Sequence, residues 1–235
     1  MDIIGAMNKE REYLSFRMKG EEPFHLVDAV KEYGFESLKD YFEAKRDYEF
    51  THFNFEIINT TTEKMVSDIF DTIEKQKKAV LLSITDKTLI WNGNNGEYNK
   101  EYCNECNIPV YPFYTGGGTI VTTPGDLNMG ICIPLNFGAD ISYILNGIAN
   151  VFQKYTSKNV EVLGNDIIVN GFKVLGSAFY ERNKMFMFVA SVSMSDKSDL
   201  ICNICLKHST KQPGYVDFMN AEQLSREIKL WLNIL

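Results

Sequence analysis

The 235-residue sequence lacks several features that mark particular protein classes. It has no apolar run near the ~18 residues that a membrane-spanning helix needs. Its beginning, Met1-Asp-Ile-Ile-Gly-Ala-Met-Asn-Lys-Glu, lacks the basic stretch followed by an apolar one that marks an export signal. Lysine and arginine number 24 against 31 aspartates and glutamates, a formal net charge of -7. Nucleic acids and anionic membranes are bound through clustered Lys and Arg, so we expect neither as a partner. Because the sequence shows neither an export signal nor a spanning helix, we expect a cytoplasmic location.

Histidine and cysteine are also scarce. The three histidines, His25, His52 and His208, lie outside every motif discussed below and are predicted to be surface residues. The five cysteines do not indicate a disulfide framework, because their number is odd and no export signal precedes them.

Four of the cysteines form two C-x-x-C pairs, Cys103 with Cys106 and Cys202 with Cys205. Four thiolates can hold one zinc ion tetrahedrally when a fold brings them together. The two pairs are far apart in the sequence, well outside the spacing of a zinc ribbon. We therefore predict free thiols, with a zinc or iron–sulfur site as the alternative. Cys132, inside an apolar strand, is predicted to be a core residue.

Hydrophobic residues make up 45% of the chain and charged residues 23%, which fits a globular protein of one or two domains. A helical N-terminal extension is predicted at residues 1–52. In it, Leu26, Val30 and Tyr33 recur at helical spacing before a stop at Gly34. A further helix start is predicted at Ser37, which has an acidic residue three positions later.

Residues 53–235 show a mixture of strand and helix patterns, which predicts an α+β fold with a mixed sheet flanked by helices. The clearest helix is predicted at 140–155, where apolar residues recur at i, i+3, i+4 and i+7. Other helices are predicted at 62–77 and from residue 220 onward. Strands are predicted at 54–58, 79–84, 88–91, 108–114, 119–123, 129–135, 160–163 and 185–194.

A tight β-hairpin is predicted in the run Asp166-Ile-Ile-Val-Asn-Gly-Phe-Lys-Val-Leu-Gly-Ser-Ala-Phe-Tyr180. Asn170-Gly171 separates two runs of β-branched and aromatic residues, and this dipeptide is the strongest short-range hairpin signal because both turn positions need positive φ. Lys173 is therefore predicted to lie near the turn, in an otherwise apolar strand.

Side chains alternate along a strand, which predicts Lys173 and Leu175 on one face and Phe172 and Val174 on the other. Small residues follow, and they leave room for a pocket on the face of the lysine: Gly176, Ser177 and Ala178. Taken alone, the stretch favours a simpler interpretation, in which the lysine is solvated on an exposed hairpin face.

A second stretch, Tyr114-Thr-Gly-Gly-Gly-Thr-Ile-Val-Thr-Thr-Pro-Gly-Asp-Leu-Asn128, lies upstream of the hairpin. Its consecutive glycines, Gly116, Gly117 and Gly118, remove side chains where a backbone must approach a ligand closely. The alternative is a plain hairpin turn.

The two stretches together resemble a known family. The upstream one is similar to the RRxSGGGxVxHDxGNLN segment of lipoate-protein ligases, and also to the RGGxxTYHGPGQ segment of octanoyl transferases. The downstream one, Gly164-Asn-Asp-Ile-Ile-Val-Asn-Gly-Phe-Lys-Val-Leu-Gly-Ser-Ala178, is similar to the GRNDxxVxGxKxSGSA segment of lipoate-protein ligases. Two motifs in the right order are more specific than either alone. The resemblance covers roughly residues 54 to 220.

The resemblance implies a biotinyl/lipoyl-ligase-like catalytic domain at 53–235, with Lys173 as the catalytic residue that contacts the carboxyl or acyl-phosphate end of an acyl chain. It implies Asn165 and Asp166 as ligands of the nucleotide or Mg²⁺, although a turn opening a strand explains this pair equally well. The implied substrate-binding residues are Gly116, Gly117, Gly118, Asn128, Gly176, Ser177 and Ala178. The implied cofactors are ATP and Mg²⁺, and the implied partners are lipoic acid or octanoate and a lipoyl-acceptor domain.

The chain departs from the family pattern at three places. Pro112 and Phe113 stand where lipoate ligases carry paired arginines, and Thr122-Thr123 replaces His-Asp. Val189-Ala190 replaces a later His-Gly. Each lost cation or donor would weaken nucleotide or transition-state binding by about 1–3 kcal/mol.

The function implied by the resemblance is attachment of a lipoyl or octanoyl group to a lysine of an acceptor domain through an acyl-adenylate. The departures leave two alternatives, a non-catalytic homologue that binds the acyl group or acyl-adenylate, and an octanoyl transferase that needs no ATP. A role for Cys132 as an acyl-thioester nucleophile is disfavoured, because its surroundings do not reproduce the cysteine motif of such transferases. An accessory polypeptide is a further expected partner, since the chain leaves no room for a separate C-terminal accessory domain.

Overall fold

The computed structural model describes residues 1–21, 24–51, 55–113, 117–134, 141–207 and 211–232. The chain divides into two compact units, the first containing the helices of Met1–Phe53 and the second the elements that follow. Residues 52–54, where a domain boundary is predicted, lie outside the described ranges, and the domain assignment stays a prediction. Among the described residues, no helix is both long and apolar enough to cross a membrane.

The first unit consists of helices α1 (Ile3–Met18), α2 (Leu26–Glu32) and α3 (Leu38–Thr51). The sequence signals at its turns are present in the structure. Gly34, just after α2, has a φ of 89°, and the backbone N–H of Asp40 donates to the Ser37 side chain at 3.1 Å. Both features occur because the N–H and C=O groups at the ends of a helix have no partner inside it. A capping side chain or a turn of left-handed backbone supplies one.

Apolar side chains from all three helices and the turn before α3 form the core of the first unit: Ala6, Met7, Val30, Phe35 and Tyr41. Glu10 is buried at its edge, where its carboxylate accepts hydrogen bonds from the Tyr41 hydroxyl at 2.7 Å and from Lys45 Nζ at 2.5 Å. This carboxylate is therefore paired, as a buried charge must be.

The second unit is built on a seven-stranded sheet in the order β1-β2-β6-β10-β9-β8-β7. Only β1 and β2 pair in parallel among the described ladders of this sheet. The strands are β1 (Glu56–Asn59), β2 (Ala79–Ile84), β6 (Leu127–Pro134), β7 (Val160–Leu163), β8 (Asp166–Val169), β9 (Phe172–Arg182) and β10 (Met185–Val192).

A three-stranded sheet in the order β4-β3-β5 completes the strands. Its members are β3 (Leu89–Gly93), β4 (Val110–Phe113) and β5 (Thr119–Thr122), and β3 pairs with β4 in parallel and with β5 antiparallel. The predicted α+β class is confirmed, with the strands divided between two mixed sheets rather than gathered in one.

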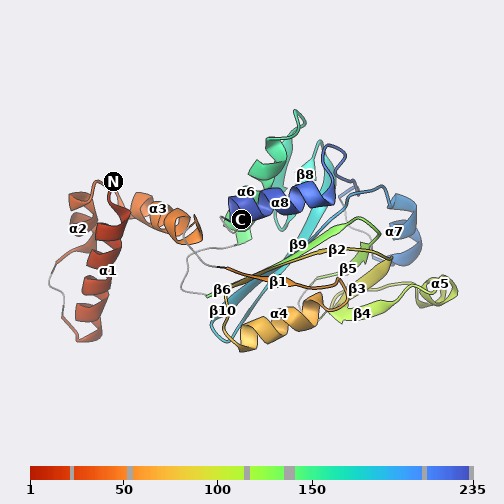
Figure 1. Ribbon diagram of the computed structural model, residues 1–235, viewed down its shortest axis with the longest axis horizontal. Helices are drawn as coiled ribbons and strands as arrows, with labels where there is room; N and C mark the ends of the chain where they lie inside the picture. Colours follow the sequence, from red (N-terminus) through yellow and green to blue (C-terminus); the bar gives the residue numbers. More distant parts are fainter. Residues whose placement is uncertain (22–23, 52–54, 114–116, 135–140, 208–210, 233–235) are drawn as a thin grey trace. The chain divides into compact units, whose positions relative to one another are not determined.

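Helices cover both faces of the large sheet (Figure 1). Helix α4 (Met65–Glu74) packs on β2, β6 and β10, whereas α6 (Ile141–Gln153) and α8 (Ala221–Trp231) pack on each other, α6 also on β7 and β8 and α8 on β2. The contact between α6 and α8 is close, since a β-carbon placed on Gly147 would lie 2.0 Å from the Trp231 ring.

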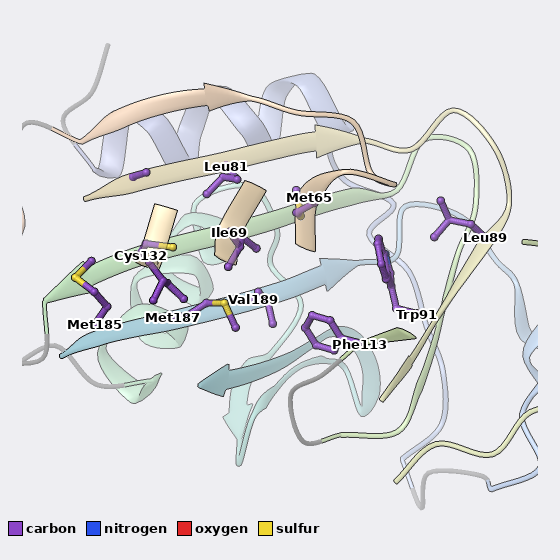
Figure 2. Close-up of a cluster of buried hydrophobic side chains, with 12 residues drawn as sticks. Met65, Ile69, Leu81, Leu89, Trp91, Phe113, Cys132, Met185, Met187 and Val189 are labelled. Carbon is purple, nitrogen blue, oxygen red and sulfur yellow. The ribbon is translucent and has the colours of Figure 1, made fainter. Parts of the chain in front are cut away.

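The core on the α4 face joins the two sheets, and Figure 2 shows its side chains converging from α4 and both sheets. Met65 and Ile69 reach from α4, Trp91 from β3 and Phe113 from β4. They meet the same-face residues of the large sheet: Ala79, Leu81, Cys132, Met185, Met187 and Val189. The small sheet is therefore held against one face of the large sheet by apolar packing.

Two short helices were not predicted, α5 (Lys100–Glu105) and α7 (Ser198–Ile204). Their side chains pack together with β3 and β5 in a buried cluster that contains Ile90, Cys103, Val121, Ile204 and Cys205. Each is too short to show an apolar period. The signal present in the sequence for α5 is Asn99, whose side chain accepts from the backbone N–H of Tyr102 at 3.1 Å and caps the helix.

Candidate functional site

The predicted hairpin is present between β8 and β9. Asn170 has a φ of 54° and Gly171 a φ of 88°, so both turn positions lie in the left-handed region that this dipeptide favours. The backbone of Lys173, two residues later, is held on a second side as well, since its N–H donates to the Gln212 carbonyl at 2.8 Å and its carbonyl accepts from Gly214 at 2.9 Å. The local sequence thus fixes the lysine beside a turn.

The prediction that Lys173 and Leu175 share one face of the strand is wrong, because β9 carries a bulge between them. Lys173 pairs with Ile168, but Leu175 pairs with the preceding Ile167, which leaves Val174 as an extra residue. One inserted residue shifts the alternation of the strand. As a result, Lys173 and Gly176 face the same cavity, while Leu175 is fully buried elsewhere.

Gly176 provides the space into which the lysine side chain extends. A β-carbon added at Gly176 would lie 3.0 Å from Cε and 3.1 Å from Nζ of Lys173. The ammonium therefore lies above the backbone of Gly176. The expectation that a small residue makes room for the lysine is met at this position.

Asp166 holds two ammonium groups at the same place. One of its carboxylate oxygens lies 2.9 Å from Nζ of Lys173, and the other lies 2.6 Å from Nζ of Lys211. The Asp166 side chain is only 13% exposed. A partly buried carboxylate between two lysines orients both of them.

The cavity that Lys173 faces has a volume of about 300 Å³. Its walls come from β5 (Thr119, Ile120 and Val121), from β9 and β10 and from α7. The described lining includes four lysines, Lys173, Lys197, Lys207 and Lys211, and no aspartate or glutamate. These lysines pair with three carboxylates that lie outside the lining, Asp126, Asp166 and Glu97, so the inner surface of the cavity presents ammonium groups, which suit an anionic ligand.

Lys197 is the most deeply buried of these lysines, with a side chain 6% exposed. It lies 2.5 Å from the carboxylate of Asp126, which is completely buried. Asp126 also accepts from the backbone N–H and hydroxyl of Thr123 and from the N–H of Met194. Burial lowers the pKa of Lys197, and Asp126 opposes that change. Neither residue belongs to a pattern that would single it out in the sequence.

A small apolar pocket adjoins the cavity, and the two share Ile120 and Ser191 in their walls. Its lining includes Met65, Ile69, Trp91 and Phe113 from the core of Figure 2, together with Met129. Its volume is about 30 Å³, the space of roughly one water molecule. The cationic cavity thus adjoins an apolar pocket, and the side chains that line this pocket nearly fill it.

The other predicted substrate residues lie at different distances from these hollows. Gly116 is outside the described residues. The carbonyls of Gly117 and Gly118 accept hydrogen bonds from Asn95 and Gly93, so the described part of the glycine turn is tied to the end of β3 and precedes the cavity wall at Thr119.

Asn128 lines the apolar pocket, but its side-chain amide donates to the Thr85 hydroxyl at 2.7 Å. Ser177 lines neither hollow, and its hydroxyl donates to the carbonyl of Asn165 at 2.7 Å. Ala178 packs against the core under α4. Of the predicted residues Gly176, Ser177 and Ala178, Gly176 is therefore the one that lines the cavity.

The two C-x-x-C pairs come closer than their spacing suggested. Helices α5 and α7 pack on each other, and Cys103 and Cys205 lie in one buried cluster, while Cys106 and Cys202 are exposed. Within the described ranges, no three His, Cys, Asp or Glu side chains are grouped so as to hold a metal ion.

Burial raises the pKa of the Cys132 thiol to about 12, which disfavours a thiolate nucleophile there.

The family model for the lipoyl protein ligase A/B catalytic domain matches residues 61–216. The chain belongs to this family. The match includes the glycine turn, the bulged strand of Lys173 and helix α7, and so contains every wall of the cationic cavity. No curated protein matches the chain significantly.

Solved structures of lipoate ligases share the fold. LipL1 of P. falciparum in complex with lipoate has 15% identity and a TM-score of 0.64, and the match covers 75% of this chain and 59% of that one. The bi-partite lipoate protein ligase of T. acidophilum, from a structural analysis of that ligase and its E2 lipoyl domain, has 16% identity and a TM-score of 0.61, with 77% and 84% covered. Lipoate-protein ligase A bound with ATP has 15% identity and a TM-score of 0.62, with 76% and 84% covered. The chain thus spans less than two thirds of the LipL1 chain and is a divergent family member.

Proposed function

We propose that this chain is a lipoate-protein ligase-like acyltransferase, which attaches a lipoyl or octanoyl group to a lysine of an acceptor domain through an acyl-adenylate. The observation that carries the proposal is the position of Lys173. The bulge at Val174 turns its ammonium into a cavity of about 300 Å³, next to the strand that follows the glycine turn. Both motifs of the family thus contribute to one hollow.

The chemistry requires an acyl carboxylate to be activated and then attacked by an amine. In such a reaction Lys173 would place a fixed positive charge beside the carboxylate or phosphoryl oxygens, where negative charge develops. Asp166 keeps that ammonium, and the ammonium of Lys211, in place. Of the other lysines of the wall, Lys197 is paired with Asp126 and Lys207 with Glu97, so Lys173 and Lys211 are the cations that would face a nucleotide.

ATP fits the described lining, whereas a Mg²⁺ ion held by the protein does not. The four lysines supply donors for phosphate groups. Mg²⁺ needs carboxylate or carbonyl oxygens, and the two carboxylates beside the cavity, Asp126 and Asp166, are both held by lysines. The predicted role of Asp166 towards Mg²⁺ therefore gains no support, and no step is derived through a metal.

The apolar pocket is the proposed end of the acyl slot. Its volume of about 30 Å³ is too small for an acyl chain unless side chains move. Met65 and Met129 lie in its wall, and methionine is the apolar side chain that rearranges most readily. We therefore infer that an acyl chain displaces these side chains when it enters.

The proposed partners follow those of the relatives. LipL1 was solved with lipoate, and the T. acidophilum ligase is described as bi-partite, with an E2 lipoyl domain that belongs to the same lipoylation system. We propose lipoic acid or octanoate as the substrate and a lipoyl domain as the acceptor, with an accessory polypeptide as a further partner.

The test replaces Lys173 by methionine, which keeps the length of the side chain and removes its charge. Transfer of lipoate to a lipoyl domain in the presence of ATP is expected to fall at least a hundredfold, because several ligand oxygens lose their cation. Lys77→Met is the control, since this lysine pairs with Glu56 at the surface, outside the cavity lining. Retained transfer by Lys173→Met would reject the assignment.

The same assay separates the alternatives. Wild-type protein that binds lipoate and ATP but releases no pyrophosphate would be a non-catalytic binder. Protein that transfers octanoate from an octanoyl-carrier protein without ATP would be an octanoyl transferase. Lys173 and Lys211, two lysines that share one carboxylate, favour the ATP-dependent reaction, because an acyl thioester alone brings no negative charge for them to bind.

A further inference from the structure

Ser191, in β10, is a polar residue in a buried position. The residue is 9% exposed, and its Oγ has no hydrogen-bond partner in the described part of the chain. A buried hydroxyl without a partner is destabilising, because it has lost the hydrogen bonds that water provides. Such a group calls for an explanation, and a ligand is one.

The position of Ser191 is the junction of the two hollows. Alternate residues of a strand face the same side. Along β10 and just past its end, they pass from the apolar pocket at Val189, through Ser191, to the cationic cavity at Ser193. Ser191 lines both. A molecule with an apolar tail and an anionic head, lying across both hollows, has the first atoms of its head at this residue.

Lys173 reaches the same point from the neighbouring strand. Ser191 pairs with Gly176 in the antiparallel ladder of β9 and β10, so the two are direct cross-strand neighbours. The Lys173 ammonium lies 3.1 Å from where a β-carbon of Gly176 would be. An ammonium and an unsatisfied hydroxyl therefore converge over one glycine, which has no side chain of its own.

We propose that the Ser191 hydroxyl donates a hydrogen bond to a carboxyl oxygen of the acyl substrate, next to the oxygen that Lys173 contacts. The inference rests on the proposed function and adds to it the residue that fixes the acyl head. Ser191 acts by binding and orienting the carboxyl group, and it takes no part in proton transfer. The residue thereby sets where the apolar tail ends and the reacting group begins.

The experiment compares two buried serines of the large sheet. Ser191→Ala removes a hydroxyl without a partner, and Ser83→Ala removes one that is bonded to Thr62 at 2.9 Å and lines neither hollow. Thermal unfolding is measured without ligand, and binding of lipoate, octanoate and ATP is measured separately by calorimetry.

The two variants are expected to respond in opposite ways. Without ligand, Ser191→Ala should unfold at the wild-type temperature or above it, because a buried unsatisfied group has been removed. Its affinity for lipoate and octanoate should fall about tenfold or more, and its affinity for ATP should be unchanged. Ser83→Ala should unfold at a lower temperature and bind lipoate as the wild type does.

Three results would overturn the inference. The first is wild-type affinity of Ser191→Ala for lipoate and octanoate. The second is a fall in its unfolding temperature as large as that of Ser83→Ala, which would show that the hydroxyl is bonded within the protein. The third is a loss of affinity for ATP alone. If the wild-type protein itself binds neither lipoate nor octanoate, the proposed function fails, and the inference fails with it.

Discussion

The two adjoining hollows of the second unit differ in what fills them. The cationic cavity keeps about 300 Å³ open, although four lysines line it, whereas the apolar pocket keeps about 30 Å³. Ammonium groups resist close packing because each must retain a partner or water. Apolar side chains close on one another because that removes them from water. The proposed site for a molecule with a charged head and an apolar tail is thus open where the head would bind and closed where the tail would bind, until a ligand enters.

The largest expected effect concerns the charge buried in the wall of the cationic cavity. Lys197→Met leaves the carboxylate of Asp126 buried without its cation, which should lower the free energy of unfolding by about 3–5 kcal/mol. Urea unfolding measures the loss. The double variant with Asp126→Asn removes both charges and should recover part of it. A single variant as stable as the wild type would mean that this wall does not depend on the ion pair.

A smaller effect is expected where the lysine side chain crosses Gly176. Gly176→Ala places a methyl group about 3.0 Å from Cε of Lys173 and displaces the ammonium from above the glycine. Transfer activity should fall about 10–100-fold, because small displacements of a catalytic group cost that much. Stability should change little, since the end of a flexible side chain can move. Circular dichroism and urea unfolding check the fold beside the activity assay.

The smallest effect is expected in the apolar pocket. Val189→Ala should cost about 1–2 kcal/mol of stability, because it removes roughly two buried methylene equivalents. It should also enlarge the pocket and raise the relative affinity for longer or bulkier acyl chains. Calorimetry with fatty acids of increasing length measures this change. An unaltered preference would show that the tail of the substrate does not reach Val189.

The sequence was sufficient wherever a local rule decides the structure. Asn170-Gly171 predicted the hairpin because few dipeptides tolerate positive φ at two successive positions. The pattern around Ser37 predicted a helix start for the same kind of reason, since a side chain that can cap an exposed N–H is visible in the sequence.

The sequence was insufficient wherever the structure depends on contacts between distant residues. The bulge at Val174 is set by pairing with β8 rather than by β9 itself, so simple alternation assigned Lys173 to the wrong neighbours. Lys197 lies in the polar run Ser-Asp-Lys-Ser-Asp, which is typical of an exposed loop, and only the fold shows that Asp126 draws it inside. Ser191 has no signal in the sequence, because its hydroxyl is unsatisfied only in the fold, where no donor or acceptor from another described residue reaches it.

The hydrogen bonds that hold the Lys173 backbone from Gln212 and Gly214, together with the ladder to β8, have a consequence for binding. A residue anchored on both edges has already lost its main-chain freedom during folding. An arriving substrate then restricts only the rotations of four methylene groups, which is a small entropic loss. The chain segment that provides this second anchor is therefore a place where a change that never touches the substrate can weaken its capture.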